Sequence, residues 1–87
     1  MIFDPPTLET VAGRTSDTRG NILRKLNSGA RIPFDELIPL VGHLSKVENK
    51  SVQTRRRILN IQLTRLRKEL GPKYSIECMT TFRLVRN

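Results

Sequence analysis

The sequence predicts an α+β domain built from three helices, one short strand and a C-terminal β-hairpin. Residues 51–71 carry leucines at helical spacing with arginines between them, and Gly71-Pro72 ends the run. Two later segments, 74–78 and 82–86, alternate apolar and polar residues as half-buried strands do. The 87 residues have room for one small domain with a core just large enough to fold unaided.

Residues 1–16 are predicted to form an N-terminal arm, and residues 17–87 the folded domain. The arm contains Pro5-Pro6 and Gly13 and shows only weak periodicity. We therefore expect an extended segment with about one turn of helix over residues 8–12. An inert packing role is favoured over a functional one.

The first helix is predicted over residues 17–27. The oxygen of Ser16 or Asp17 can accept from an exposed N–H of the first turn and so cap the helix. Gly20 lowers the helical propensity of this turn by about 1 kcal/mol. The apolar face consists of Ile22, Leu23 and Leu26, and Asn27-Ser28-Gly29 ends the helix.

A short strand over residues 30–32 and a second helix over residues 34–44 are expected next. Pro33 suits a helix start, and the acids at 35 and 36 suit the positive end of its dipole. The helix is predicted to bury Leu37, Ile38, Val41 and Leu44. Pro39 either lies at the edge of the first turn or kinks the helix. Residues 45–50 form a loop, unless Ser45 and Glu48 make a capping box for an earlier start of the next helix.

The third helix is predicted to begin between residues 51 and 54 and to end at Gly71, whose backbone is expected to take a positive φ. At 100° per residue, one side of this helix forms a core stripe of Val52, Leu59, Leu63, Leu66 and Leu70. The opposite side presents Arg57, Asn60, Ile61, Thr64, Arg65 and Lys68. A helix held by leucines with arginines facing outward is suited to a nucleic-acid groove.

The two C-terminal strands are predicted to pair as a hairpin because their connection is short. Ile76 and Cys78 alternate with polar neighbours, as do Phe82 and Leu84. Cys78 is accordingly expected to be a small core residue, and a reactive thiol is the less favoured alternative.

Net charge is unevenly distributed along the chain. Residues 1–45 hold five basic and five acidic side chains, whereas residues 46–87 hold eleven basic and three acidic ones, so the whole excess of +8 lies in the second half. A soluble basic surface is the alternative explanation, but the asymmetry favours a polyanionic partner.

Several function classes lack the residues that they need. One cysteine excludes an internal disulfide and suits a reducing cytosol, and His43 has no partners at metal-ligand spacing. We expect no metal, no cofactor and no catalysis, because nucleophile-and-base schemes have almost nothing to use. No apolar run approaches the roughly 20 residues of a membrane span. The start, MIFDPPTLET, lacks the pattern of a signal peptide, so a cytoplasmic, nucleoid-associated location is expected.

The order of the elements and two motifs resemble those of a known family. ILNIQLTRLRKEL (residues 58–70) followed by IECMTTFRLV (residues 76–85) resembles the winged helix-turn-helix DNA-binding domain of OmpR/PhoB-type response regulators. That family ends in a pattern like VDVHIxRLRxKL and then IxTVRGxGYRL. GARIPFDEL (residues 29–37) is similar to its glycine, short strand and acidic helix start. The resemblance covers residues 20–85 and is moderately specific.

The chain departs from the family pattern at both ends. We expect no counterpart of the family's receiver domain, and the short arm of residues 1–16 could at most replace its four-stranded N-terminal sheet. At the tip of the hairpin, or wing, Met79, Thr80 and Thr81 stand in place of the expected Arg-Gly and Gly-Tyr. The wing is therefore shorter and less basic than in the family.

If the third helix enters a major groove, its outward residues divide into two roles. Base contacts are predicted for Arg65 with guanine, Asn60 with adenine and Ile61 with a thymine methyl, and Thr64 could contact a base or a phosphate. Phosphate contacts are predicted for Arg55, Arg56, Arg57, Arg67, Lys68, Lys73 and Arg83. A solvated helix face is the alternative for the arginines, and Ile61 could instead pack against the second helix.

The leading hypothesis is a sequence-specific double-stranded DNA-binding protein, a small transcriptional regulator. The family resemblance implies homodimers on repeated half-sites. The alternative is a protein-interaction module on the same scaffold, binding an acidic partner such as RNA polymerase or another regulator. RNA binding is less favoured, because no aromatic stacking platform is visible.

Overall fold

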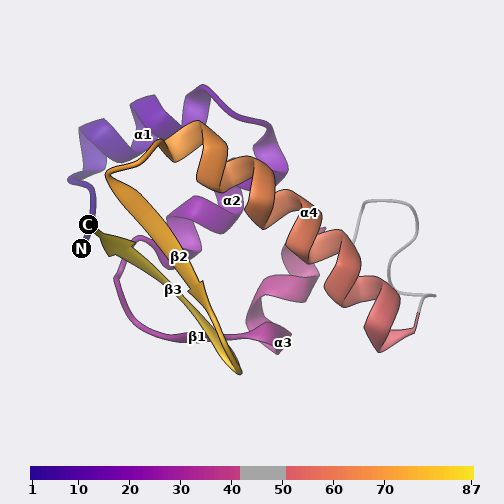
Figure 1. Cartoon of the computed structure of the whole chain (residues 1–87). Coiled ribbons are helices and arrows are strands. Elements are labelled where there is room, and N and C mark those ends of the chain that lie inside the picture. The colour runs from indigo at the N-terminus through magenta and orange to yellow at the C-terminus, as the bar shows by residue number, and fades with distance from the viewer. Residues whose placement is uncertain (42–50) are drawn as a thin grey trace.

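A computed structural model describes residues 1–41 and 51–87 of the chain. In chain order its elements are α1 (Pro5–Gly13), α2 (Asp17–Leu26), β1 (Ile32–Pro33), α3 (Phe34–Leu37), the 3-10 helix η1 (Ile38–Val41), α4 (Val52–Leu70), β2 (Tyr74–Cys78) and β3 (Thr81–Arg86) (Figure 1). The predicted α+β class is confirmed, but these residues contain four α-helices rather than three.

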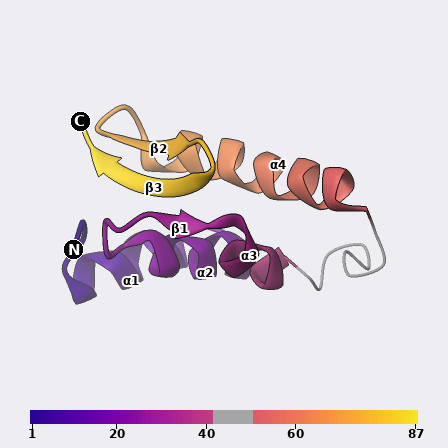
Figure 2. The same cartoon turned by 90° about the horizontal axis from the view of Figure 1, so that it is seen from below.

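The elements form two layers around one core. Figure 2 shows α4 and the β2–β3 hairpin on one side, with α1, α2 and α3 on the other. The sheet is antiparallel in the order β1-β3-β2, so β3 lies between its two neighbours. The side chains that are completely buried are Ile22, Leu23, Leu26, Leu37, Val41, Leu59, Leu63, Leu66 and Leu84. Both layers therefore contribute to the interior that holds α4 in place.

The N-terminal segment is helical and joined to the core, which corrects the expectation of an extended arm. Its helix covers nine residues instead of one turn. Ahead of it, the Phe3 N–H donates to Asn27 Oδ1 at 2.7 Å, and Asn27 Nδ2 donates to the Phe3 carbonyl at 3.0 Å. The Ile2 N–H donates to the Asn27 carbonyl at 2.8 Å, and the Phe3 ring lies 4.8 Å from that of Tyr74. Residues 1–13 thus belong to the folded unit.

Helices α1 and α2 meet at a close contact that explains Gly20. A Cβ at this position would lie 3.2 Å from the Ala12 carbonyl oxygen, inside ordinary contact distance. Beside this contact an exposed ion pair joins Arg24 to Glu9 at 2.9 Å. The hydrogen bond from Arg24, followed by its charge, holds the pKa of the Glu9 carboxyl below its ordinary value. Gly20 therefore lowers the helical propensity of α2 but permits the close packing of α2 against α1.

Replacing Gly20 with valine is expected to destabilise the fold by about 1–3 kcal/mol, because the larger side chain pushes α1 away from α2. Urea denaturation followed by circular dichroism measures this change. Gly13→Val is the matched control, since a Cβ at Gly13 has no atom within 4 Å. Equal losses in the two variants would contradict the close-packing explanation.

Helix α2 begins as predicted, whereas the second predicted helix changes character halfway. Ser16 caps α2 by accepting from the Arg19 N–H at 3.2 Å. The strand before α3 is Ile32–Pro33 rather than residues 30–32. The α-helical part ends at Leu37 and continues as 3-10 helix, because Pro39 has no N–H for the α-helical hydrogen bond. The predictions for Leu44, His43 and the loop 45–50 lie outside the described residues.

Helix α4 has the predicted bounds. The Ser51 hydroxyl accepts from the Thr54 N–H at 3.3 Å at its start, and Gly71 ends it with φ +82°. Three leucines of the predicted stripe are fully buried, but Val52 is 55% exposed. The prediction for Val52 was wrong because this residue occupies the first turn, which extends beyond the core.

The hairpin is also present, with Tyr74 paired to Arg86 and Cys78 to Phe82 at its two ends. Ile76, Phe82 and Leu84 are buried as predicted. Cys78 is exposed, which corrects its assignment to the core. It follows the predicted alternation and pairs with buried Phe82, but it is the last residue of β2 and lines the open groove between the hairpin and α4.

Candidate nucleic-acid interface on α4

The candidate site is the outer face of α4. Apolar and polar contacts on the inner side of this helix hold it against the rest of the fold. Leu59, Leu63 and Leu66 fill the core beneath it. Near the C-terminal end of the helix, Arg19 of α2 pairs with Glu69 at 2.9 Å, and its Nη1 donates to Gln62 Oε1 at 3.1 Å. These contacts set the rotation of α4 about its axis and therefore decide which residues face outward.

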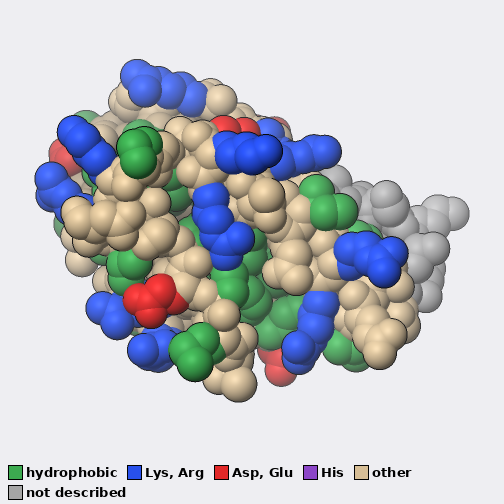
Figure 3. Space-filling view, in the orientation of Figure 1, with side chains coloured by type: hydrophobic (Ala, Val, Ile, Leu, Met, Phe, Trp, Pro, Cys, Tyr) green, Lys and Arg blue, Asp and Glu red, His purple; other side chains and the backbone are tan. Residues whose placement is uncertain are grey.

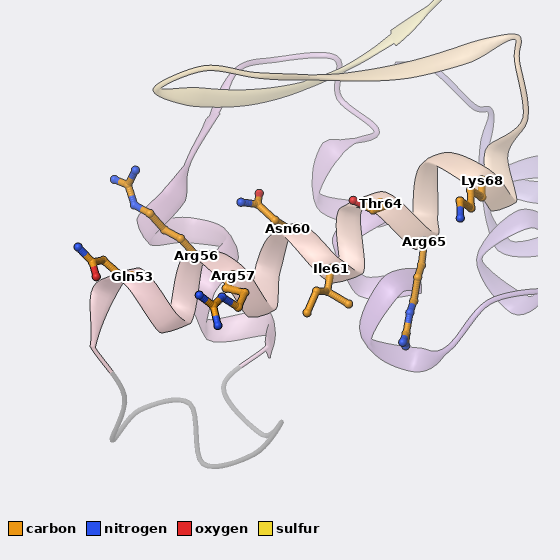
Figure 4. Close-up of a pocket in the computed structure, with 8 residues that line it drawn as sticks. All are labelled: Gln53, Arg56, Arg57, Asn60, Ile61, Thr64, Arg65 and Lys68. Carbon is orange, nitrogen blue, oxygen red and sulfur yellow. The ribbon is translucent and has the colours of Figure 1, made fainter.

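The outward face forms one shallow, open depression along the helix, with a volume of about 650 Å³. It is lined by Gln53, Arg56, Arg57, Asn60, Ile61, Thr64, Arg65 and Lys68. Figure 4 shows Asn60 projecting toward the hairpin, whereas Ile61 and Arg65 project away from the hairpin on the other flank of the same depression. The two flanks of the depression therefore present different chemistry.

No acidic side chain lines this depression. Glu69, the acid of α4, is exposed beside it but is already neutralised by Arg19. Arg57, Arg65 and Lys68 are exposed and form no ion pair with any residue that the structure describes. The face therefore presents uncompensated positive charge to solvent.

The position of the arginines in α4 opposes the stability of the helix. The N-terminal end of a helix carries partial positive charge, which favours acidic neighbours and disfavours basic ones. The first turn of α4 contains no acid, and Arg55, Arg56 and Arg57 follow directly. Helix stability therefore does not explain this arrangement.

A second groove, of about 340 Å³, separates α4 from the tip of the hairpin. Its lining consists of Phe34, Arg56, Asn60, Cys78, Met79, Thr80 and Phe82. The Arg56 guanidinium lies 4.9 Å from the centre of the Phe34 ring, a cation–π contact that orients it between the two depressions. Figure 3 shows this side of the molecule, where Lys and Arg side chains are spread along α4 and apolar surface is visible between the helix and the hairpin.

All four residues predicted to contact bases lie together in the first depression: Asn60, Ile61, Thr64 and Arg65. Ile61 is 44% exposed, so it is not sequestered against the second helix. The predicted base-contacting residues thus share one accessible face.

The seven residues predicted to contact phosphate lie at different places in the structure. Three of them, Arg56, Arg57 and Lys68, lie on the outer face with the base-contact residues. Arg55 is half-buried and has an interaction within the protein, and Lys73 is exposed in the turn between α4 and β2. Their positions set these two apart from the depression.

Arg67 and Arg83 are used or placed differently from the other arginines. Arg67 Nη2 donates to the Ile76 carbonyl at 3.1 Å and also contacts Cys78 Sγ, so it joins α4 to β2. Arg83 pairs in register with Glu77, on the face of the hairpin opposite to buried Leu84. Its Nε is buried without a hydrogen-bond partner among the described residues. Neither guanidinium lines the α4 depression.

Six residues that line the two grooves were not predicted as site residues: Gln53, Phe34, Cys78, Met79, Thr80 and Phe82. Gln53 lies one helical turn before Arg57, so extending the 100° spacing to the start of α4 would have found it. Phe34 and Met79 enter the second groove from other elements. Their positions depend on how α3 and the hairpin pack beside α4, for which the sequence carries no local signal.

No helix within the described ranges is both long and apolar enough to cross a membrane. Residues 1–41 and 51–87 likewise contain no group of three or more His, Cys, Asp or Glu side chains placed to hold a metal ion. Comparisons with protein-family models, with curated proteins and with solved structures find no match for this chain. The resemblance to OmpR/PhoB-type domains therefore rests on its sequence motifs alone.

Proposed function

We propose that this chain is a sequence-specific double-stranded DNA-binding protein that places α4 in the major groove, on a winged-helix scaffold whose wing is the β2–β3 hairpin. The observation that carries the proposal is the acid-free face of α4, where Arg57, Arg65 and Lys68 have no partner among the described residues. DNA supplies the regularly spaced negative charge that such a face lacks.

The dimensions of α4 suit this role. A helix with its side chains is about 10–12 Å across, and the major groove is about 12 Å wide. The lining from Gln53 to Lys68 covers roughly 22 Å at about 1.5 Å per residue. A helix of this length can contact several successive base pairs together with the phosphates on both sides of the groove.

The side chains on the face include both kinds of contact that specific binding requires. Arg65 offers a planar pair of donors that matches guanine O6 and N7, and the Asn60 amide can pair with adenine N6 and N7. Ile61 offers an apolar surface to a thymine methyl, and Thr64 a hydroxyl to a base or phosphate. The phosphate contacts are assigned to Arg56, Arg57 and Lys68, and they fix the register of the helix in the groove.

The order of elements supports the winged-helix assignment. Helices α2 and α3 precede the basic helix, β1 pairs with β3, and the hairpin follows α4 directly. Helix α1 is an addition on the side of α2, joined through Gly20. The proposal places α2, α3 and α4 in the positions of the three helices of the family.

Arg65→Ala is expected to weaken binding to the preferred duplex by about 1–3 kcal/mol and to relax specificity at one base pair, because it removes a bidentate contact. Arg65→Lys keeps the charge but loses the planar fork, so it should lose specificity while keeping the salt dependence. Both variants are compared with parent protein on a duplex selected from a random library and on single-base-pair substitutions of it. An unchanged preference in both variants would remove Arg65 from base recognition.

Fluorescence anisotropy with labelled duplex across a salt series tests the proposed function. Log affinity should fall linearly with log salt, at a slope of about −0.9 per phosphate neutralised. Titration above the dissociation constant gives the stoichiometry, and two chains per site would support binding as a homodimer. Absence of binding at low salt, or an affinity indifferent to salt, would reject the proposal.

A further inference from the structure

We infer that Met79, at the tip of the β2–β3 hairpin, inserts as an apolar wedge into the minor groove next to the major groove that holds α4, and that it bends the duplex. The inference rests on the proposed function, because it takes the position of α4 on DNA as given. It adds a second activity, deformation of DNA, and assigns it to a residue outside α4.

The exposure of Met79 is not explained by the fold. Its side chain is 78% exposed, more than any other large hydrophobic side chain among residues 1–41 and 51–87. It lies in the turn after β2, where its N–H donates to the Thr81 carbonyl at 3.0 Å. Tight turns favour Gly, Asn, Asp, Ser or Pro for backbone reasons, and methionine supplies none of these. The residue type is therefore unnecessary for the turn itself.

The tip is also without charge. Met79, Thr80 and Thr81 are neutral, and the nearest charged pair along the strands, Glu77 and Arg83, is on the face of the hairpin directed away from buried Leu84. The hydroxyls of Thr80 and Thr81 can contact phosphates, whereas the Met79 side chain cannot. Methionine is one of the apolar side chains that enter base steps from the minor groove, and its unbranched chain adapts to irregular spaces.

The hairpin is supported firmly enough to press a side chain into stacked bases. On one side, Arg67 of α4 donates to the Ile76 carbonyl and contacts Cys78, immediately before Met79. On the other side, β1 pairs with the first residues of β3, Pro33 with Thr81 and Ile32 with Phe82. Contacts with α4 and with β1 thus hold the turn on both sides, next to the residue that would push against the stacked bases.

The tip lies in the right place relative to α4. Met79 and Thr80 line the same groove as Arg56 and Asn60 of α4, which also line the proposed DNA-binding face, so the tip lies next to that face beside the N-terminal half of the helix. The centres of the major and minor grooves are about half a helical repeat apart on one face of a duplex, roughly 17 Å. Because α4 fills the major groove, an element packed at its side overhangs the adjacent strand and minor groove.

Met79 lines the second groove, of about 340 Å³, and its side chain is 78% exposed, so it can contact a duplex without displacing a core residue. Minor-groove wedges bend DNA toward the major groove. A bend in that direction closes the duplex around α4 and brings more phosphates to Arg56 and Arg57.

The test uses the full chain and the duplex selected from a random library. One set of duplexes carries 2-aminopurine at successive positions beside the α4 footprint, and another carries a donor and an acceptor dye at its ends. Parent protein should raise 2-aminopurine fluorescence at a single step and increase energy transfer between the ends. Met79→Ala should abolish both signals and lower affinity by about tenfold or less. Met79→Leu should keep both signals.

Thr80→Ala is the matched control, because it alters the same turn without removing the wedge, and it should behave as parent protein. Thermal denaturation of each variant should show parent stability, since both side chains are exposed. Salt-dependent binding by parent protein with no change in either signal would overturn the wedge and leave the proposed function intact. Loss of the signals in Thr80→Ala as strongly as in Met79→Ala would also overturn it. Failure of parent protein to bind any duplex would overturn both proposals.

Discussion

The double variant Arg57→Glu/Lys68→Glu is expected to bind duplex DNA at least about 100-fold more weakly than parent protein. Each substitution removes a cation from the outer face of α4 and places a repelling carboxylate opposite a phosphate. Both side chains are exposed and form no ion pair with the described residues, so the fold should be retained, with a loss of only about 1 kcal/mol in stability because Lys68 is a favourable basic residue of the last turn. Anisotropy titrations at two salt concentrations measure the loss, and circular dichroism confirms that the helices are retained.

A second pair of variants separates the effect of where a charge lies from the effect of net charge. The single variants Lys68→Glu and Lys25→Glu change net charge equally, but Lys25 is an exposed residue of α2 that does not line the α4 depression. We expect Lys68→Glu to lower the affinity for duplex strongly. Lys25→Glu should lower it only a few-fold, because its charge acts on DNA at long range and salt screens such interactions. Equal losses would show that overall charge, and not the α4 face, governs binding.

Asn27→Ala is expected to lower the free energy of unfolding by about 2–4 kcal/mol. The side chain of Asn27 is buried and satisfies both the N–H and the carbonyl of Phe3, at 2.7 Å and 3.0 Å. Alanine leaves both backbone groups without this partner and releases the segment that leads into α1. For a domain of this size the loss corresponds to a decrease in Tm of roughly 10–30 °C.

Asn21→Ala provides the control in the same helix. The Asn21 side chain is exposed and accepts a hydrogen bond from Arg24 at 2.9 Å, so its removal should cost less than about 0.5 kcal/mol. Urea denaturation of the two variants and the parent gives the comparison. If Asn27→Ala were as stable as Asn21→Ala, residues 1–13 would be a dispensable arm after all.

Helix α4 and the hairpin could be predicted because their signals are local. Ser51 caps the first turn of the helix, Gly71 takes the positive φ that ends it, and the leucines between them follow one helical stripe. The alternation around Ile76 and Leu84 fixes which strand face is buried. The four predicted base-contact residues were found in one depression for the same reason: helical spacing alone puts them on one face.

The parts that were missed depend on contacts distant in sequence. The helix over residues 5–13 is held by Asn27 and by the close approach of Ala12 to Gly20, and neither pairing has a sequence pattern. For Arg67 the sequence predicts a phosphate contact and gives no sign of the hydrogen bond that its guanidinium donates to the Ile76 carbonyl, because β2 returns beside α4 only in the fold. Cys78 obeys the alternation that predicts burial, yet it is exposed because the hairpin and α4 leave an open groove beside it. In each case the packing of segments distant in sequence, and not the residue type, decides where the side chain lies.

The crowding of Arg55, Arg56 and Arg57 near the positive end of α4 has a thermodynamic consequence for the free protein. Mutual repulsion and the helix dipole both oppose this arrangement, and added salt screens both effects. Salt should therefore stabilise the unbound fold while it weakens the complex, so the two equilibria respond to ionic strength with opposite signs. Duplex at about 100 times its dissociation constant would contribute about 2.7 kcal/mol to folding by mass action. The ligand would then stabilise the helix whose charges attract it.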